Sequence, residues 1–176
     1  MSARRSVAHV VCFGNAWHGD DGFGQHVFRC LQANGVLPPG VMAFDAGTAG
    51  LYALGYFDGC AKAVMVDAVR TGARVGTVHR LLPSDLAPPR AEFSLHELGV
   101  CTLLAALATA SRHPPDVVLI GAEVGDVQTF TEQLSAPLEA AVAAATRLVL
   151  RECRPRTAGT GRKVPSRAPE TGYIDR

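Results

Sequence analysis

The sequence predicts an α/β protein, a three-layer sandwich in which helices flank a mostly parallel sheet of about five strands. Short valine-rich runs alternate along the chain with longer segments of helical periodicity. An apolar run without polar alternation is typical of a strand buried on both faces, as in a parallel sheet covered by helices. The alternation of strands with helices indicates the same architecture. In such folds the ligand crevice lies at the carboxyl ends of the strands.

The first half of the chain contains three expected strands and two helices. The first strand is rich in valine and stops at Gly14, and the helix after it is ended by Gly35, a residue suited to a helix C-terminus. The second strand leads into a turn that begins at Asp45, and the third is closed by Asp67. The expected elements are a strand at 7–13, a helix at 23–34, a strand at 41–44, a turn at 45–50, a short helix at 51–57 and a strand at 61–66.

The second half adds two strands and two longer helices. The link between the third and fourth strands is too short for a crossover helix, so the fourth is expected to run antiparallel to the third. Ser94 and Glu97 have the spacing of a capping box at a helix start, and Pro114 ends that helix. Ser135 caps the last helix. The expected elements are a strand at 77–82, a loop at 83–93, a helix at 94–111, a strand at 117–120 and a helix at 135–153.

Length and composition favour a single domain. The chain has 176 residues, of which 48% are hydrophobic and 19% charged, which suits one core. Its net charge of +1 argues against a nucleic-acid partner. Residues 1–150 hold 10 Lys and Arg against 13 Asp and Glu, whereas residues 151–176 hold 7 against 3. We expect one α/β domain at 1–153 and a basic, disordered tail at 154–176.

The sequence also indicates a cytoplasmic protein with no membrane partner. No apolar run reaches the roughly 18 residues of a membrane helix, because charges interrupt the most apolar stretch at 136–150. Arginines precede the first strand, but no convincing signal-peptide cleavage site follows. The five cysteines are an odd number without Cys-x-x-Cys spacing, so neither a disulfide framework nor a zinc ribbon is indicated.

The loop at 14–24 contains four glycines and two adjacent carboxylates, Asp20 and Asp21. It lacks the Gly-Lys-Ser/Thr ending of a P-loop and the Gly-x-Gly-x-x-Gly fingerprint, and its carboxylates would repel a phosphate. Nucleotide binding is therefore disfavoured, and a cation is the better partner for this loop. Either acid alone could instead cap the following helix.

Two further residues have side chains suited to metal binding. Asp67 is the only charge in the apolar run at 63–69, and a buried carboxylate needs a donor, a charged partner or a metal. His96 falls in the first turn of its helix, where the helix dipole favours the neutral imidazole that binds metal. Each has an ordinary alternative, since a strand-end Asp can bind backbone amides and a helix-start His can lie on the surface.

The three candidates would meet at one edge of the sheet. Asp21 follows the first strand, Asp67 closes the third, and His96 starts a helix that could cover the same crevice. The first and third strands are neighbours if the second lies outside the first. Two carboxylates and an imidazole, with open positions for water or substrate, suit Zn²⁺, Ni²⁺, Fe²⁺ or Mn²⁺.

Four segments resemble a known family, the hydrogenase maturation endopeptidases, which process the large subunit of nickel–iron hydrogenases. The likeness extends over about residues 7–149, and the four segments follow each other in the family's order and spacing. An Asp-Asp-Gly-x-Gly motif alone is weak, but the four together are specific. The segments are the loop at 13–24, Asp-Ala-Gly-Thr-Ala-Gly at 45–50, Val-Asp-Ala at 66–68 and Ser-Leu-His-Glu-Leu-Gly at 94–99.

The resemblance implies a metal-dependent endopeptidase whose catalytic and metal-binding residues are Asp21, Asp67 and His96. Such an enzyme removes the C-terminal extension of a large-subunit precursor after nickel insertion. The nickel is then carried by the substrate, although another divalent metal could occupy the site in vitro. Gly47 and Thr48 would shape the substrate groove, or simply form a strand-to-helix turn. The family also implies a monomer.

One region departs from the family pattern. The family commonly has a Glu-Pro-like pair after the fifth strand, whereas here Glu123 is followed by Val124, and the loop at 124–132 is unusual. This region could tune which hydrogenase is recognised. A second hypothesis is a non-catalytic assembly factor that binds the immature large subunit and senses nickel with the same ligands.

Overall fold

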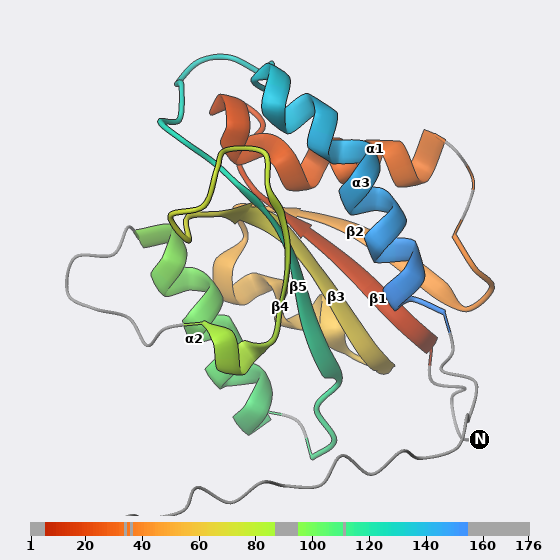
Figure 1. Ribbon diagram of the computed structural model, residues 1–176. Coiled ribbons are helices and arrows are strands. Elements are labelled where there is room, and N and C mark those ends of the chain that lie inside the picture. Colours follow the sequence, from red (N-terminus) through yellow and green to blue (C-terminus); the bar gives the residue numbers. More distant parts are fainter. Residues whose placement is uncertain (1–5, 34, 36, 87–94, 111, 155–176) are drawn as a thin grey trace, which may run out of the picture.

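A computed structural model describes residues 6–33, 35, 37–86, 95–110 and 112–154, with only the backbone described for 6, 7 and 95–99. The described residues contain five strands, three α-helices and three short 3₁₀ helices, joined by loops (Figure 1). In chain order they are β1 (Ser6–Phe13), η1 (Gly19–Gly22), α1 (Phe23–Ala33), β2 (Val41–Gly47), η2 (Gly50–Phe57), β3 (Cys60–Val69), β4 (Val78–Leu81), η3 (Pro83–Asp85), α2 (Leu95–Ala110), β5 (Asp116–Glu123) and α3 (Ala136–Glu152).

The strands form one sheet in the order β2-β1-β3-β5-β4. The first four run parallel, and β4 pairs antiparallel with β5 at the edge. β2 lies outside β1, so β1 and β3 are neighbours, as the prediction of a shared crevice required. The predicted fold class, a mostly parallel five-stranded sheet between helices, is confirmed.

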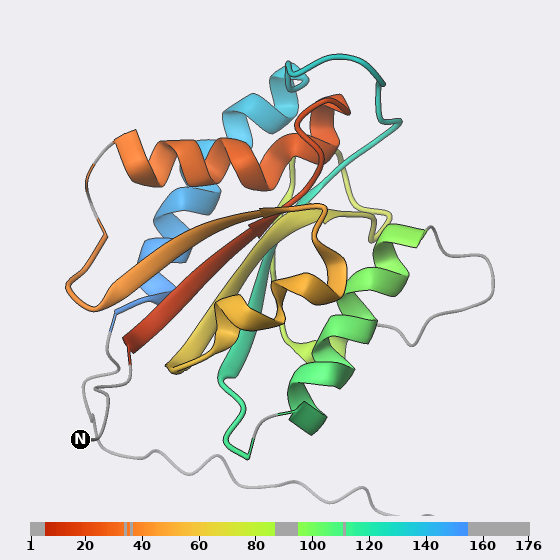
Figure 2. The same cartoon turned by 180° about the vertical axis from the view of Figure 1, so that it is seen from behind.

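Side chains alternate between two cores, one on each face of the sheet. Ala8, Val10 and Cys12 of β1 belong to the core under α1 and α3, whereas Val11 and Phe13 belong to the core under η2 and α2. This alternation follows from the two-residue period of a strand. Figures 1 and 2 show α1 and α3 on one side of the sheet and η2 and α2 on the other. Burial on both faces explains the continuous apolar runs in the sequence.

Three strands extend past their predicted ends. β2 continues to Gly47, so the prediction of a turn that begins at Asp45 was wrong, and so was the prediction that Asp67 closes the third strand. β3 continues to Val69 and β5 to Glu123, because Asp67 pairs with Gly121 and Val69 with Glu123 in a parallel ladder. Apolar runs mark only the central part of these strands. Their carboxyl ends carry the buried polar side chains of Asp67 and Glu123, and that is where function-bearing residues of this fold are expected.

The fourth strand runs antiparallel, as predicted, but it lies beside β5 and not beside the third strand. Both edges of β3 are already occupied, by β1 and β5. The link after β3 therefore passes to the far side of β5, where Gly76 N and Glu123 O are 2.9 Å apart. The sequence indicated the direction of this strand, but its neighbour depends on pairing that only the whole sheet determines.

Both long helices occur near their predicted positions. α2 starts at Leu95, and the proposed capping residue Ser94 lies outside the described residues. α3 ends at Glu152, and the predicted tail lies outside them from residue 155 onward. None of the helices in the described part of the chain has the length and apolarity to span a membrane.

A partly exposed ion cluster joins the end of α3 to the sheet. Lys62 Nζ donates to Glu152 Oε2 at 2.6 Å and to the Glu152 carbonyl oxygen at 2.9 Å. Arg80 Nε donates to Glu152 Oε1 at 2.8 Å. The hydrogen bond from Arg80, reinforced by Lys62 and opposed by burial, lowers the pKa of Glu152 to about 2. This carboxylate thus joins three elements, α3, β3 and β4.

Replacing Glu152 by Gln should destabilise the protein at neutral pH but not near pH 2. The folded pKa of about 2 lies below the ordinary value of 4.5. The carboxylate's contribution is therefore fully present above about pH 4.5 and is lost as the pH falls toward 2. We expect a loss of about 2 kcal/mol at pH 7, measured by urea unfolding across this range. A difference that does not change with pH would contradict this origin, and Glu139→Gln on the exposed face of α3 is the control.

Candidate functional site

Two glycines allow the loop between β1 and α1 to pack tightly against the carboxyl edge of the sheet. Gly14 has a φ of 132°, and a Cβ there would lie 2.0 Å from the Asp21 carbonyl oxygen. A Cβ on Gly24 would lie 2.0 Å from the Phe13 carbonyl oxygen and 2.9 Å from that of Val66. Only glycine tolerates such approaches. Close backbone packing thus accounts for these glycines without a bound phosphate.

Asp21 lies in η1, the short turn that packs against β3. Its carboxylate Oδ2 accepts a hydrogen bond from Asn15 N at 3.1 Å, and its own N–H donates to His18 O at 3.1 Å. The side chain is partly exposed. These bonds hold the Asp21 carboxylate at the edge of the sheet, next to the strand that carries Asp67.

Asp67 lies in the last third of β3 and is only 2% exposed. Its Oδ1 accepts a hydrogen bond from Ala68 N at 2.8 Å, as the alternative reading of a strand-end Asp anticipated. Burial raises the pKa of the neighbouring Cys12 thiol, and the negative charges of Asp45 and Asp67 raise it further. The carboxyl ends of β1, β2 and β3 thus bring two carboxylates around one buried thiol.

His96 lies in the first turn of α2, but its side chain is outside the described part of the structure. Figure 2 shows that α2 begins near the edge where β3 and β5 end. Among the side chains that the structure does describe, no three His, Cys, Asp or Glu residues are grouped closely enough for a metal ion. A ligand set of Asp21, Asp67 and His96 therefore stays a prediction.

The predicted substrate-binding residues lie at the same edge: Gly47 is the last residue of β2 and Thr48 follows it. Gly47 has a φ of 49°; its N–H donates to Asp45 Oδ1 at 3.1 Å, and its carbonyl oxygen accepts from Gly14 N at 3.0 Å. Thr48 is exposed. The turn thus ties the end of β2 to the end of β1. A role in binding substrate remains a prediction.

Residues 126–135, which we call the strap, connect β5 to α3 across the Asp21 loop. Thr131 N donates to Trp17 O at 3.1 Å, and Gly19 N donates to Thr131 O at 2.8 Å, which forms a parallel bridge. Farther along, His26 Nε2 lies 3.1 Å from the Glu132 carbonyl oxygen. The strap is therefore fixed to the loop and to the first helix by several hydrogen bonds.

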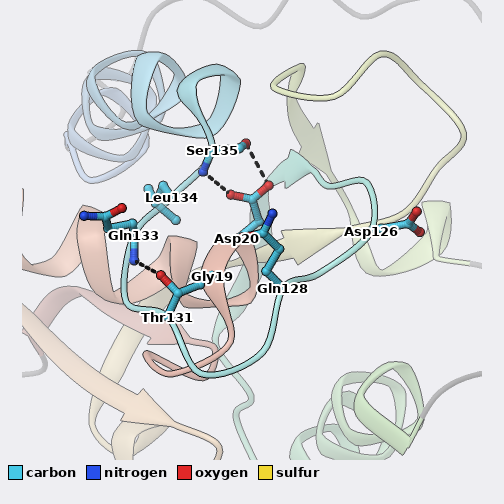
Figure 3. Close-up of a pocket in the computed structure, with 8 residues that line it drawn as sticks. All are labelled: Gly19, Asp20, Asp126, Gln128, Thr131, Gln133, Leu134 and Ser135. Carbon is cyan, nitrogen blue, oxygen red and sulfur yellow. Dashed lines mark hydrogen bonds between the residues drawn. The ribbon is translucent and has the colours of Figure 1, made fainter.

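Asp20 holds the end of the strap (Figure 3). Its two carboxylate oxygens accept hydrogen bonds from Ser135 N at 2.6 Å and from Ser135 Oγ at 2.8 Å. Ser135 stands at the N-cap of α3 as predicted, but its hydroxyl makes no bond to the helix and instead donates to Asp20. Of the two adjacent acids, Asp20 thus serves the fold. A polar cavity of about 150 Å³ lies alongside, lined by Gly19, Asp20, Asp126, Gln128, Thr131, Gln133, Leu134 and Ser135.

Asp20→Ala should destabilise the protein by about 2 kcal/mol, because both donors of Ser135 lose a charged acceptor. Ser135→Ala should cost about 1 kcal/mol, since the backbone N–H keeps its bond. The double variant should lose less stability than the sum of the two single losses. Urea unfolding of the four proteins in a double-mutant cycle measures this difference. Asp126→Ala, an exposed residue of the same cavity, is the matched control. Additive costs would show that Asp20 and Ser135 act separately.

Glu123 forms a second buried network, which the sequence did not reveal. The side chain is 2% exposed and accepts hydrogen bonds from Thr71 N at 2.8 Å, Thr71 Oγ1 at 2.7 Å and Gly72 N at 2.9 Å. His79 Nε2 lies 3.1 Å from Glu123 Oε2. Burial acts to raise the pKa of Glu123, but these hydrogen bonds outweigh it and lower the pKa below its ordinary value. The sequence signal that could have indicated this network is the position of Glu123 after an apolar strand. No sequence signal pointed to His79.

Comparisons with known proteins agree on one family. A family model described as hydrogenase maturation protease matches residues 25–152. Hydrogenase expression/formation protein HoxM of Azotobacter vinelandii is 28% identical over 144 residues, which are 80% of this chain and 69% of that protein. The structure of the hydrogenase maturating endopeptidase HybD from E. coli has a TM-score of 0.71 and 25% identity, covering 83% of this chain and 91% of that one. A hydrogenase 2 maturation peptidase from a Thaumarchaeota archaeon has a TM-score of 0.61 and 31% identity, covering 83% and 97%.

Proposed function

The chain belongs to the hydrogenase maturation protease family, and we propose that it removes the C-terminal extension of a nickel–iron hydrogenase large-subunit precursor after nickel insertion. Its relatives are named as maturation proteases and endopeptidases, so the reaction class is hydrolysis of a peptide bond. The finer features of the proposal are the dependence on metal, the timing after nickel insertion and the roles of individual residues.

One observation carries the proposal: two carboxylates lie on elements that are packed together. Asp67 is buried on β3, and Asp21 lies in η1, which packs against β3. Carboxylates and an imidazole are suitable donors for Ni²⁺. Asp21, Asp67 and His96 would hold the precursor through the nickel that it carries. The precursor would thus be recognised only when its metal is in place.

In this proposal the chain's own residues act mainly by positioning. Holding the precursor through its nickel places the scissile amide next to the two carboxylates. Such positioning converts an encounter of separate groups into a reaction within one complex, which accounts for a large share of many enzymatic rate enhancements. Water then adds to the amide carbon while a carboxylate accepts its proton, and the C–N bond breaks as that proton passes to the departing amine nitrogen.

The test is cleavage of the cognate large-subunit precursor, followed by intact-mass spectrometry. The nickel-loaded precursor should lose one C-terminal peptide in the presence of the protein, and the nickel-free precursor should keep its full mass. Equal cleavage of both would contradict nickel sensing. Stable binding without any loss of mass would instead support the second hypothesis, a non-catalytic assembly factor.

A further inference from the structure

Large apolar side chains are exposed mainly around the carboxyl edge of the sheet. Among the described residues six such side chains are at least 40% exposed, and four of them lie on segments that follow β1, β2 and β5. Exposed apolar residues that cluster, unlike scattered ones, indicate an interaction site. The four are Trp17 at 62%, Leu51 at 49%, Tyr52 at 94% and Phe130 at 89% exposed.

Trp17 and Phe130 are brought together by the strap. The hydrogen bonds of Thr131 to Trp17 and Gly19 join the two segments beside both aromatic residues. Phe130 has a φ of 61°, and a bulky residue in this left-handed region is uncommon. The hydrogen bonds of Thr131 hold the backbone directly after Phe130, whose ring lies in solvent. Both rings are therefore presented on an ordered backbone.

Trp17 is connected through Asn15 to Asp21, a candidate catalytic residue. Trp17 N donates to Asn15 Oδ1 at 3.0 Å, and Asn15 N donates to Asp21 Oδ2 at 3.1 Å. Trp17 therefore lies on the same loop as Asp21, four residues before it, and the bond from Thr131 N to Trp17 O places the backbone of Phe130 beside that loop. The aromatic pair is continuous with the proposed catalytic edge.

We propose that Trp17 and Phe130 bind an apolar segment of the hydrogenase precursor close to the bond that is cleaved. This inference rests on the proposed function. The two rings stand open to solvent and not in an enclosed cavity, which suits a polypeptide better than a small molecule. The strap carries Asp126 and Glu132 and no Lys or Arg, so the bound segment is expected to lack negative charge.

The test compares steady-state cleavage of nickel-loaded precursor by the wild type and by the double variant Trp17→Ala with Phe130→Ala. We expect KM to rise at least tenfold, as for loss of interface aromatic residues, with kcat changed less than threefold. The backbone bonds that hold Asn15 and Thr131 remain in these variants. Trp17→Phe with Phe130→Tyr should keep the wild-type KM. The control is Met42→Ala with Leu82→Ala, two exposed apolar residues away from this edge.

The outcomes separate this inference from the proposed function. An unchanged KM in the double alanine variant overturns the inference, as does an equal rise in the control. A lower kcat with unchanged KM also overturns it, because the rings would then position the site and not bind substrate. A wild-type dimer that the double variant abolishes would show that a second copy covers the rings. If Asp67→Asn is inactive while the aromatic variant keeps its KM, only this inference fails; if Asp67→Asn cleaves normally, the catalytic assignment fails.

Discussion

Asp67→Asn should reduce cleavage of the nickel-loaded precursor by at least a hundredfold, within the range that loss of an acid–base or charge-stabilising group produces. The substitution keeps the shape of the side chain and an oxygen that can accept the Ala68 N–H bond. It removes the negative charge that would face the nickel of the precursor. The rate is measured by following the mass of the released peptide.

The controls for this prediction separate chemistry from folding. Asp21→Asn should reduce the rate similarly, and Asp58→Asn, on an exposed residue before β3, should leave it unchanged. Thermal unfolding of all three should stay within a few degrees of the wild type. Wild-type rates in both Asp21→Asn and Asp67→Asn, with the variants folded, would exclude these carboxylates from the reaction.

Much of the fold followed from the sequence because the sheet is buried on both faces. Apolar runs and helical periodicity indicated every strand and α-helix. The position of β2 outside β1 was only a condition for the common crevice, and the sheet order meets it. Strand ends could not be predicted as well. β3 and β5 continue through polar residues, since pairing between the two strands keeps Asp67 and Glu123 extended although neither side chain is apolar.

The candidate site was predictable where one residue stood out from its surroundings. Asp67 was visible as a single charge in an apolar run, and it is buried as expected. The structural role of Asp20 was not visible, because its partner is Ser135, 115 residues later. Likewise, Trp17 and Phe130 become neighbours only through the strap. Such long-range pairs leave no local spacing pattern in a sequence.

Glu123→Ala should have the largest effect on stability, on the order of 3 kcal/mol, since it leaves buried donors without an acceptor. Glu123→Gln should cost about 1 to 2 kcal/mol, because the amide can accept at one position only. The folded pKa lies below the ordinary value of 4.5, so the contribution is present above about pH 4.5 and is lost as the pH falls further.

The structural origin of this effect can be tested at the amides themselves. Glu123 accepts bonds from Thr71 and Gly72 in the link that follows β3. In Glu123→Gln the amide hydrogens of these two residues should exchange with solvent faster than in the wild type, while those of Val64 in the centre of β3 change less. Glu132→Gln, an exposed carboxylate, should alter neither stability nor exchange. Uniformly faster exchange would indicate global destabilisation. An increase confined to Thr71 and Gly72 would show that Glu123 holds the link that follows β3.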